Sequence, residues 1–363
     1  MSVKTPVMGW DSRRAFGKNV SEEVILASAD ALVSSGLRDC GYEYVLISDG
    51  WACAERNDGV LAPDPEKFPH GMEYIAGQLH SRGLKLGLYI GSGSLGNEFA
   101  DAQTLSDWSV DLVQIDLQSV PEDVRRAEYC SKMSMALTAV GAEAVLCCCD
   151  GDVSSTAAAR EAGAEMIRTS ADFADTLESF SGVAVSRMDS LGTALPGCFN
   201  DLGSLTVAMK KEEGTGDVCS KESRKLEFAW WSMFASPLMI GGDIRELSDD
   251  AKEILCNREI IAVDQDPEAR PAFLAGGYRG ERMAFFRHLD NGEYALLLVN
   301  LNIFNQKIRV DFSDVGLSDN SGYGFDVYDL YEHENVGSFR ESFISTVPMK
   351  GCKMYRLRLT GRV

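Results

Sequence analysis

The sequence predicts an α/β protein: a (β/α)8 TIM barrel followed by a C-terminal antiparallel β sandwich. Up to about residue 265, short apolar runs alternate with longer stretches of helical periodicity. Near-continuous apolar runs are typical of parallel strands buried on both faces. After residue 267 the pattern changes to period-2 alternation with turns that contain Gly or Asn. Because 363 residues exceed what one compact core usually holds, we expect a catalytic barrel over 1–267 and a sandwich over 268–363.

Eight apolar runs are the candidate barrel strands, and helical stretches lie between them. The runs cover residues 7–10, 42–48, 84–90, 111–116, 143–149, 165–170, 197–202 and 237–242. Two of the helical stretches, 21–37 and 220–235, begin with Ser21 and Ser220, which are typical helix-capping residues. Gly36 is expected to close the first of them. Eight strands that are each followed by a helix match a (β/α)8 barrel.

The C-terminal region predicts antiparallel strands. Alternating runs cover residues 282–289, 293–301, 306–312, 324–331 and 352–359. Asp290, Asn291 and Gly292 lie between the first two runs, which is a strong hairpin signal. This part of the chain therefore predicts a sandwich of antiparallel sheets.

The charge balance excludes several classes of partner. The chain has 35 Lys and Arg against 55 Asp and Glu, a net charge of -20. Such a surplus repels phosphate backbones and anionic lipid surfaces, so we expect neither nucleic acid nor a membrane as partner. No apolar run approaches the roughly 18 residues of a membrane span, and the first residues lack a signal-peptide pattern. We expect a cytoplasmic protein, unless a leader was removed.

The ten cysteines predict buried thiols rather than disulfides or a metal site. Cys147, Cys148 and Cys149 are consecutive in an apolar run, as expected of small side chains that pack in a buried strand. No CxxC pair occurs, and no cysteine lies close to the four scattered histidines. We therefore expect reduced thiols, no metal and no organic cofactor.

One glycine-rich segment imitates a nucleotide-binding motif. The sequence GSGSLG (91–96) fits G-x-G-x-x-G and follows a predicted strand. A dinucleotide site needs a helix that begins within the glycine loop, so that its N-terminus meets the pyrophosphate. Here we expect the next helix only from about residue 101, which argues against a dinucleotide.

Charged residues at the ends of the apolar runs are the candidates for catalysis, because barrel active sites form at the carboxyl ends of the strands. Asp49, Asp116, Arg168, Asp172 and Asp201 occupy such positions. A single Asp after a strand is more often a helix cap or turn former. Several carboxylates at one barrel mouth, however, are what glycoside hydrolysis needs, since one attacks the anomeric carbon and another protonates the leaving oxygen. Arg168 fits a sugar contact and a barrel-end salt bridge equally well.

Nine motifs occur in an order that resembles the melibiase or alpha-galactosidase family of retaining glycoside hydrolases (clan D). They are MGWDS (8–12), SDGW (48–51), FPHGM (68–72), HSRGLKLGLY (80–89), DAQTLSDWSVDLVQID (101–116), RTSAD (168–172), PGCFND (196–201), SPLMIGGDIR (236–245) and AVDQDP (262–267). This family also includes alpha-N-acetylgalactosaminidases and beta-L-arabinopyranosidases. The resemblance implies a retaining double displacement in which Asp116 matches the nucleophile and Asp172 the general acid/base.

The resemblance also implies a sugar pocket, and this sequence departs from it at several positions. The substrate-binding residues that we expect are Trp10, Arg13, Asp49, Tyr89, Gln114, Arg168 and Asp201. The family usually has Asp where Ser48 stands, Lys where Gln114 stands, Asp at Gly203 and an aromatic residue near Arg13. Gly50 and Leu117 stand near positions of the family's usual disulfide cysteines, so those disulfides cannot form as such. We therefore expect an atypical pocket.

The leading prediction is a glycosidase that cleaves a terminal alpha-galactoside from an oligosaccharide or glycoconjugate. The altered pocket leaves open a modified glycone, such as an alpha-N-acetylgalactosaminide, a beta-L-arabinopyranoside or an anionic sugar. A carbohydrate-binding relative without activity is the alternative from another class. A homo-oligomer also stays open.

Overall fold

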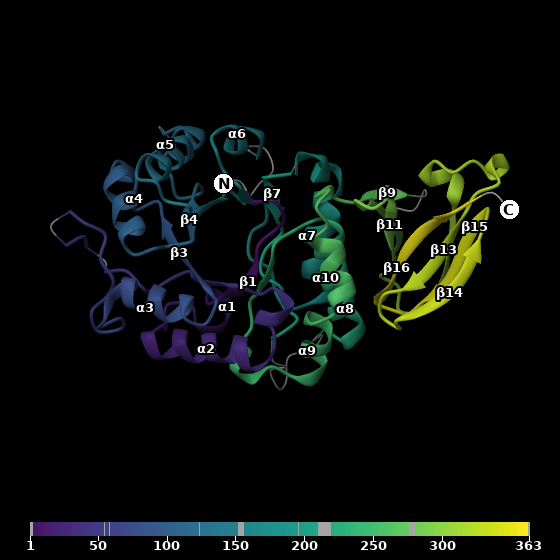
Figure 1. The fold of residues 1–363 in the computed structure, drawn as a ribbon, viewed down its shortest axis with the longest axis horizontal. Coiled ribbons are helices and arrows are strands. Elements are labelled where there is room, and N and C mark those ends of the chain that lie inside the picture. The colour runs from purple at the N-terminus through teal and green to yellow at the C-terminus, as the bar shows by residue number, and fades with distance from the viewer. Residues whose placement is uncertain are drawn as a thin grey trace. The chain divides into compact units, whose positions relative to one another are not determined.

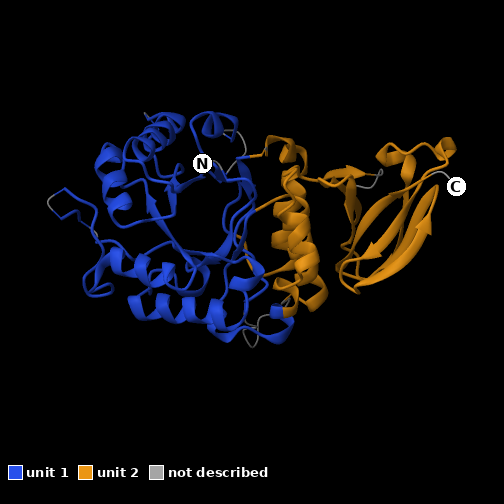
Figure 2. Cartoon of the chain, viewed as in Figure 1, with its two compact units in different colours: residues 1–172, 197–210, 237–252 blue, residues 173–196, 211–236, 253–363 orange. Residues whose placement is uncertain are grey.

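A computed structural model of the chain describes residues 3–53, 55–57, 59–122, 124–151, 156–194, 196–209, 219–275 and 280–361. The chain gathers into two compact units (Figure 2). Unit 1 contains residues 1–172, 197–210 and 237–252, and unit 2 contains residues 173–196, 211–236 and 253–363. The boundary at residue 267 between the predicted barrel and sandwich domains stays a prediction from the sequence.

Unit 1 contains an eight-stranded parallel sheet (Figure 1). Its strands are β1 (Met8–Asp11), β2 (Tyr44–Ile47), β3 (Lys85–Gly91), β4 (Leu112–Asp116), β5 (Val145–Cys149), β6 (Met166–Arg168), β7 (Phe199–Asp201) and β8 (Leu238–Ile240). They are neighbours in the order β7-β6-β5-β4-β3-β2-β1-β8, and a parallel bridge between Leu205 and Ile240 links the segment after β7 to β8. The predicted barrel is confirmed, and each predicted run overlaps one strand, with β1 and β3 extending one residue beyond theirs.

Helices follow most of the strands in unit 1, and a side-chain cap marks the start of only some of them. The helices are α1 (Arg13–Phe16), α2 (Glu22–Ser34), α3 (Gly71–His80), α4 (Glu98–Asp107), α5 (Arg126–Ala139) and α6 (Thr156–Glu161), and α9 (Asp249–Leu255) follows β8. The Ser21 hydroxyl accepts the Val24 N–H at 3.3 Å and caps α2 as expected. α4 begins at Glu98, three residues earlier than predicted, where the Glu98 carboxylate accepts the N–H of Gly96 at 3.0 Å.

One layer of buried side chains fills the barrel below the strand ends. Its members come from β2, β4, β5, β6, β8 and the residue before β1: Val7, Leu46, Leu112, Val145, Cys147, Met166 and Met239. Residues from so many strands can pack together only inside the barrel. Side chains two residues further along a strand point to the same face. The interior above this layer is therefore lined by the polar residues that end the strands.

The described residues of unit 2 form three complete α-helices, a six-stranded antiparallel sheet and a two-stranded sheet. The helices are α7 (Leu177–Arg187), α8 (Lys221–Met233) and α10 (Arg258–Asp264), and the strands are β9 (Phe273–Ala275), β10 (Arg282–His288), β11 (Glu293–Asn300), β12 (Gln306–Asp311), β13 (Gly324–Asp329), β14 (Glu334–Phe339), β15 (Ser342–Val347) and β16 (Gly351–Thr360). The predicted hairpin is present: Leu289 donates its N–H to the Glu293 carbonyl at 2.9 Å, and Gly292 has φ +70°. The antiparallel sandwich is confirmed, and β9, β14 and β15 are additional strands that the sequence did not predict.

Both faces of the six-stranded sheet are buried at its central strands β10, β11 and β16. On one face alternate residues of β10, β11 and β16, such as Phe286, Leu296 and Tyr355, share a core with β12 and β15. On the other face Phe285 packs edge to face with Trp230 of α8, with ring centroids 6.1 Å apart. Trp230 and Trp231 are fully buried, so this pair packs in a core.

Candidate active site

A cavity of about 150 Å³ lies at the carboxyl ends of the barrel strands in unit 1. It is lined by Asp11, Arg13, Ser48, Tyr89, Gln114, Asp116, Gln118, Cys149, Arg168, Ser170, Ala171 and Asp172. Three carboxylates and two guanidinium groups thus share one small space. This is the edge of the barrel where the sequence places the chemistry.

Asp116, the last residue of β4, is fixed by three donors. Its Oδ2 accepts the Tyr89 hydroxyl at 3.1 Å and a short hydrogen bond from the Ser119 hydroxyl, and its Oδ1 accepts the Gln118 N–H at 2.8 Å. Burial and then the charge of Asp116 raise the pKa of Tyr89, so the phenol keeps its proton at neutral pH and stays a donor. The carboxylate is therefore held at the cavity in one orientation.

Asp172, four residues after the end of β6, has a guanidinium group beside each oxygen. Arg168 donates from Nη2 to Oδ1 at 2.9 Å, and Arg13 Nε lies 3.2 Å from Oδ2. The Asp172 side chain is 54 % exposed and Arg168 is buried, so the acid faces the open side of the cavity while its partner anchors it from below. The same cavity thus brings Asp116 and Asp172 together.

Arg168 also connects Asp172 to a second, buried acid. Burial opposes the charge of Arg168, but the carboxylates around it, Asp201 foremost, outweigh burial and raise its pKa. Burial raises the pKa of Asp201, although Arg168 and the Gly203 N–H, 2.7 Å from Oδ1, counteract it. Arg168 is therefore a permanent cation between two acids.

Arg13 lies over the ring of Tyr89, with its guanidinium carbon 5.9 Å from the ring centroid. Burial opposes the charge of Arg13, but Asp172, Asp49 and Asp11 outweigh it and raise the Arg13 pKa. The acids in and next to the cavity outnumber the two arginines. The site consequently has an excess of negative charge.

Four of the seven predicted substrate-binding residues line the cavity: Arg13, Tyr89, Gln114 and Arg168. Trp10, Asp49 and Asp201 do not. Trp10 alternates with Asp11 and therefore points the other way; it is fully buried, and its indole N–H donates to the Gly242 carbonyl at 2.8 Å. Asp49 lies near enough to Arg13 to raise its pKa without lining the cavity, and Asp201 lies buried beside Arg168.

Sequence reasoning missed several lining residues, among them Asp11, Gln118 and Ser170. Strand parity identifies Asp11, because it lies four residues beyond Val7 of the interior layer and so shares its face. The same parity corrects one detail of the cysteine prediction. Cys147 and Cys148 are buried as expected, whereas Cys149 is only partly buried and lines the cavity.

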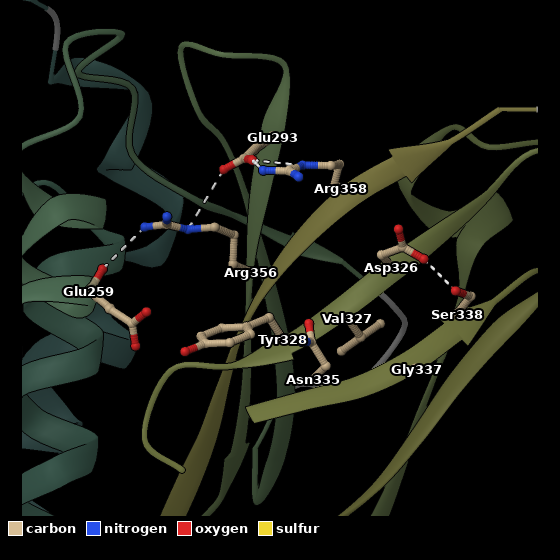
Figure 3. A pocket seen from close by; sticks show the side chains of 10 residues that line it. All are labelled: Glu259, Glu293, Asp326, Val327, Tyr328, Asn335, Gly337, Ser338, Arg356 and Arg358. Carbon is tan, nitrogen blue, oxygen red and sulfur yellow. Dashed lines mark hydrogen bonds and ion pairs between the residues drawn. The ribbon is translucent and has the colours of Figure 1, made fainter. Parts of the chain in front are cut away.

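A larger cavity, of about 580 Å³, lies in unit 2 among β11, β13, β14, β16 and α10 (Figure 3). Its acids are already engaged: Glu293 accepts from Arg358 at 2.5 Å and lies 3.8 Å from Arg356, and Asp326 accepts a short hydrogen bond from Ser338. We place the chemistry at the smaller barrel cavity, because it lies at the carboxyl ends of the parallel strands, where barrel active sites form. Within the described part of the chain, no three His, Cys, Asp or Glu residues are grouped as metal ligands.

Comparisons with known proteins identify the family of the chain. The family profile described as alpha galactosidase A matches residues 6–266, and that of the alpha galactosidase C-terminal beta sandwich domain matches residues 280–357. The chain belongs to the alpha-galactosidase family. It is a glycoside hydrolase of this family, as the order of its motifs predicted.

Individual alpha-galactosidases resemble the chain over nearly its full length. Alpha-galactosidase 3 of Arabidopsis thaliana is 34 % identical over 370 residues, covering 98 % of this chain and 82 % of the relative. The structure of alpha-galactosidase I from Mortierella vinacea matches with a TM-score of 0.87 at 28 % identity, covering 98 % of this chain and 97 % of that one. A Saccharomyces cerevisiae alpha-galactosidase solved with raffinose shares the fold, with a TM-score of 0.87 at 23 % identity and 98 % coverage of both chains. Among the described residues, no helix of this alpha-galactosidase family member has the length and apolarity to cross a membrane.

Proposed function

We propose that the chain releases a terminal alpha-galactosyl unit from oligosaccharides by retaining double displacement, with Asp116 as nucleophile and Asp172 as general acid/base. The observation that carries this proposal is that both carboxylates line one cavity at the barrel mouth and are each held by neighbouring donors. Two carboxyl groups that flank one glycosidic bond are what the retaining mechanism requires.

In the first step, an Asp116 oxygen attacks the anomeric carbon while the bond from this carbon to the leaving oxygen breaks. Asp172 donates its proton to that oxygen, so the aglycone leaves as an alcohol and Asp172 becomes a carboxylate. The Tyr89 hydroxyl, 3.1 Å from Asp116 Oδ2, holds the nucleophile in position. The product of this step is a glycosyl ester on Asp116.

In the second step, the Asp172 carboxylate takes a proton from water as the water oxygen attacks the anomeric carbon, and Asp116 is released. Arg168 and Arg13, at 2.9 and 3.2 Å, stabilise Asp172 in this ionised form. Two displacements at one carbon retain its configuration.

The charge around the cavity favours a neutral glycone. With Asp172 protonated, as the first step requires, Asp11 and Asp116 balance Arg13 and Arg168. Asp49 and Asp201 next to the cavity are further acids, so an anionic sugar would meet no surplus of positive charge. Raffinose, present in the yeast alpha-galactosidase structure, is a neutral oligosaccharide. We propose neutral alpha-galactosides of this class as substrates here, and an anionic glycone as a poor one.

The two catalytic roles are tested with aryl alpha-galactosides of different leaving-group acidity. Asp116→Asn is expected to abolish turnover of all of them. Asp172→Asn is expected to slow a phenyl substrate by about 10²- to 10⁴-fold. The same variant should form the glycosyl ester readily from a dinitrophenyl substrate, which leaves without a proton. NMR of the first-formed sugar should show the alpha anomer.

The competing function, a carbohydrate-binding protein without activity, makes the opposite prediction. Calorimetry would then show galactose binding, while no aryl galactoside is turned over faster by the wild-type chain than by Asp116→Asn. That result, or a first-formed beta anomer, would refute the proposed mechanism.

A further inference from the structure

We propose that Asp11, the last residue of β1, binds a hydroxyl of the glycone and is the third functional carboxylate of the site. The inference rests on the proposed function and adds to it a residue that determines which sugar the cavity accepts. Asp11 is 3 % exposed, and it lines the cavity together with Asp116 and Asp172.

The hydrogen bonds of Asp11 leave it room for one more donor. Oδ1 accepts the Ser48 hydroxyl at 2.5 Å and the Arg13 N–H at 2.9 Å, and Oδ2 accepts the Ser204 hydroxyl at 2.9 Å. An ionised carboxylate offers about four acceptor positions. Three are filled by these donors, so one remains on Oδ2, on a residue whose surface borders the cavity.

Among the residues that the structure describes, no side-chain cation hydrogen-bonds to Asp11, although Asp11 helps to raise the pKa of Arg13 and of Arg168. The three donors are two hydroxyls and a backbone N–H, whereas Asp172 has a guanidinium at each oxygen. Burying a carboxylate whose direct hydrogen-bond donors are all neutral is costly, and proteins retain such groups mainly where they are used. A sugar hydroxyl is a neutral donor that matches the remaining position.

Neighbouring positions explain why the carboxylate comes from β1. Ser48 follows the last residue of β2, and its hydroxyl donates to Asp11 Oδ1. Gly203 has φ +104°, a conformation that residues with a side chain rarely adopt, so no acid is readily accommodated there. Asp11, placed between Ser48 and Ser204, is thus the acid that remains at this wall of the cavity.

The sharpest test is a cycle that pairs enzyme variants with deoxy substrates. Monodeoxy aryl alpha-galactosides are assayed with wild type and with Asp11→Asn, which keeps the shape and removes the charge. In the wild type, removing the contacted hydroxyl should lower kcat/KM by about 10- to 100-fold, the effect of losing a hydrogen bond to a charged group. In Asp11→Asn the fold-loss in kcat/KM with the same deoxy substrate should be at least about fivefold smaller than in the wild type, because the contact is already weakened.

Two further variants separate binding from folding. The double variant Asp11→Ser with Ser48→Asp places the carboxylate at the other end of the hydrogen bond that joins these two residues. Its kcat/KM should be at least about tenfold higher than that of Asp11→Ser alone. Ser204→Ala removes one donor but keeps the carboxylate, so it should retain the wild-type dependence on the contacted hydroxyl.

Equal effects of every deoxy substrate on wild type and folded Asp11→Asn would overturn the proposal. So would failure of both Asp11→Asn and the double variant to fold while Ser204→Ala folds, since Asp11 would then be purely structural. If the wild type binds galactose without hydrolysing any substrate, the proposed function fails, and the same cycle is read from calorimetry with deoxygalactoses. If it neither binds nor hydrolyses, both proposals fall.

Discussion

Tyr89 controls the position of the proposed nucleophile through a single hydroxyl. Replacing it with Phe removes the 3.1 Å hydrogen bond to Asp116 and leaves the ring beneath Arg13. Because hydrogen bonds to charged groups contribute about 1.5–3 kcal/mol, kcat/KM should fall by about 10- to 100-fold. Steady-state kinetics with an aryl alpha-galactoside measure the effect.

The matched control is Tyr129→Phe. Its hydroxyl donates to the Gly91 carbonyl at 3.3 Å and does not line the cavity. We expect this variant to stay within about twofold of wild-type activity, as an exchange outside the site should. Equal losses in both variants would show that Tyr89 acts through the fold rather than through Asp116.

Strand ends explain which site residues the sequence could reveal. Asp116 and Arg168 end apolar runs that the pattern identified, so both were found. Asp11 lies in MGWDS next to the conspicuous Trp10, and only the two-residue alternation shows that Asp11 faces inward. Ser170 and Gln118 lie beyond the strand ends, where alternation no longer predicts direction.

At the scale of elements, α10 and β10 enclose a charge pair deep in unit 2. Asp264 ends α10 and Arg287 lies on β10, and both are fully buried. Arg287 donates to the Ser232 carbonyl through a short hydrogen bond and to the Asp264 carbonyl at 3.4 Å. Burial raises the pKa of Asp264 to about 8, against the attraction of Arg287.

This raised pKa makes stability depend on pH. In the folded protein Asp264 keeps its proton up to about pH 8, whereas its ordinary pKa is 3.8. The folded state therefore binds the extra proton between these values, and stability falls as pH rises through this window. In Asp264→Asn the free energy of unfolding should fall less steeply with pH, by about 1 kcal/mol per pH unit at most.

Thermal unfolding of wild type and Asp264→Asn between pH 5 and 8 measures the difference. Because the Asn side chain is neutral like protonated Asp264 and differs from it in hydrogen bonding, the slope of the midpoint against pH, rather than its absolute value, is the informative quantity. Asp290→Asn is the control, because Asp290 is exposed on the hairpin after β10. Parallel pH profiles for wild type and Asp264→Asn would show that Asp264 is already ionised when folded.

Elements with a strong period were predictable, and those without one were not. Each barrel strand lies in an apolar run, and the hairpin at residues 290–292 follows from its turn residues. β14 (Glu334–Phe339) has no buried residue, so its sequence carries no hydrophobic signal. Its place at the sheet edge follows from pairing with β13, which only tertiary structure specifies.

For the whole molecule, the sequence gives the order of the elements but not how they group. α8 looks amphipathic, yet every residue from Leu226 to Met233 is buried. One of its sides packs on β10, β11 and β16, which lie beyond the predicted boundary at residue 267. A boundary that is plain in the sequence pattern thus crosses a continuous core in unit 2.

This grouping predicts that a chain ending at residue 267 does not fold independently. It keeps α8 but lacks the strands that cover it, and Trp230 and Phe234 lose Phe285, whose ring centroid lies 6.1 and 5.3 Å from theirs. Exposing several large aromatic side chains costs about 1.5–3 kcal/mol each, a large share of the stability of a typical domain. We expect aggregated material on size-exclusion chromatography, and no hydrolysis of an aryl alpha-galactoside although Asp116 and Asp172 are both present.

The full-length variant Phe285→Ala isolates this interface. It should remain folded and active but unfold at a lower temperature, since truncating a buried Phe typically costs about 3–5 kcal/mol. Phe304→Ala, at a 67 % exposed side chain in the same unit, is the control and should leave the midpoint within about 1 °C. A soluble, active 1–267 fragment would contradict the prediction and establish residue 267 as a true folding boundary.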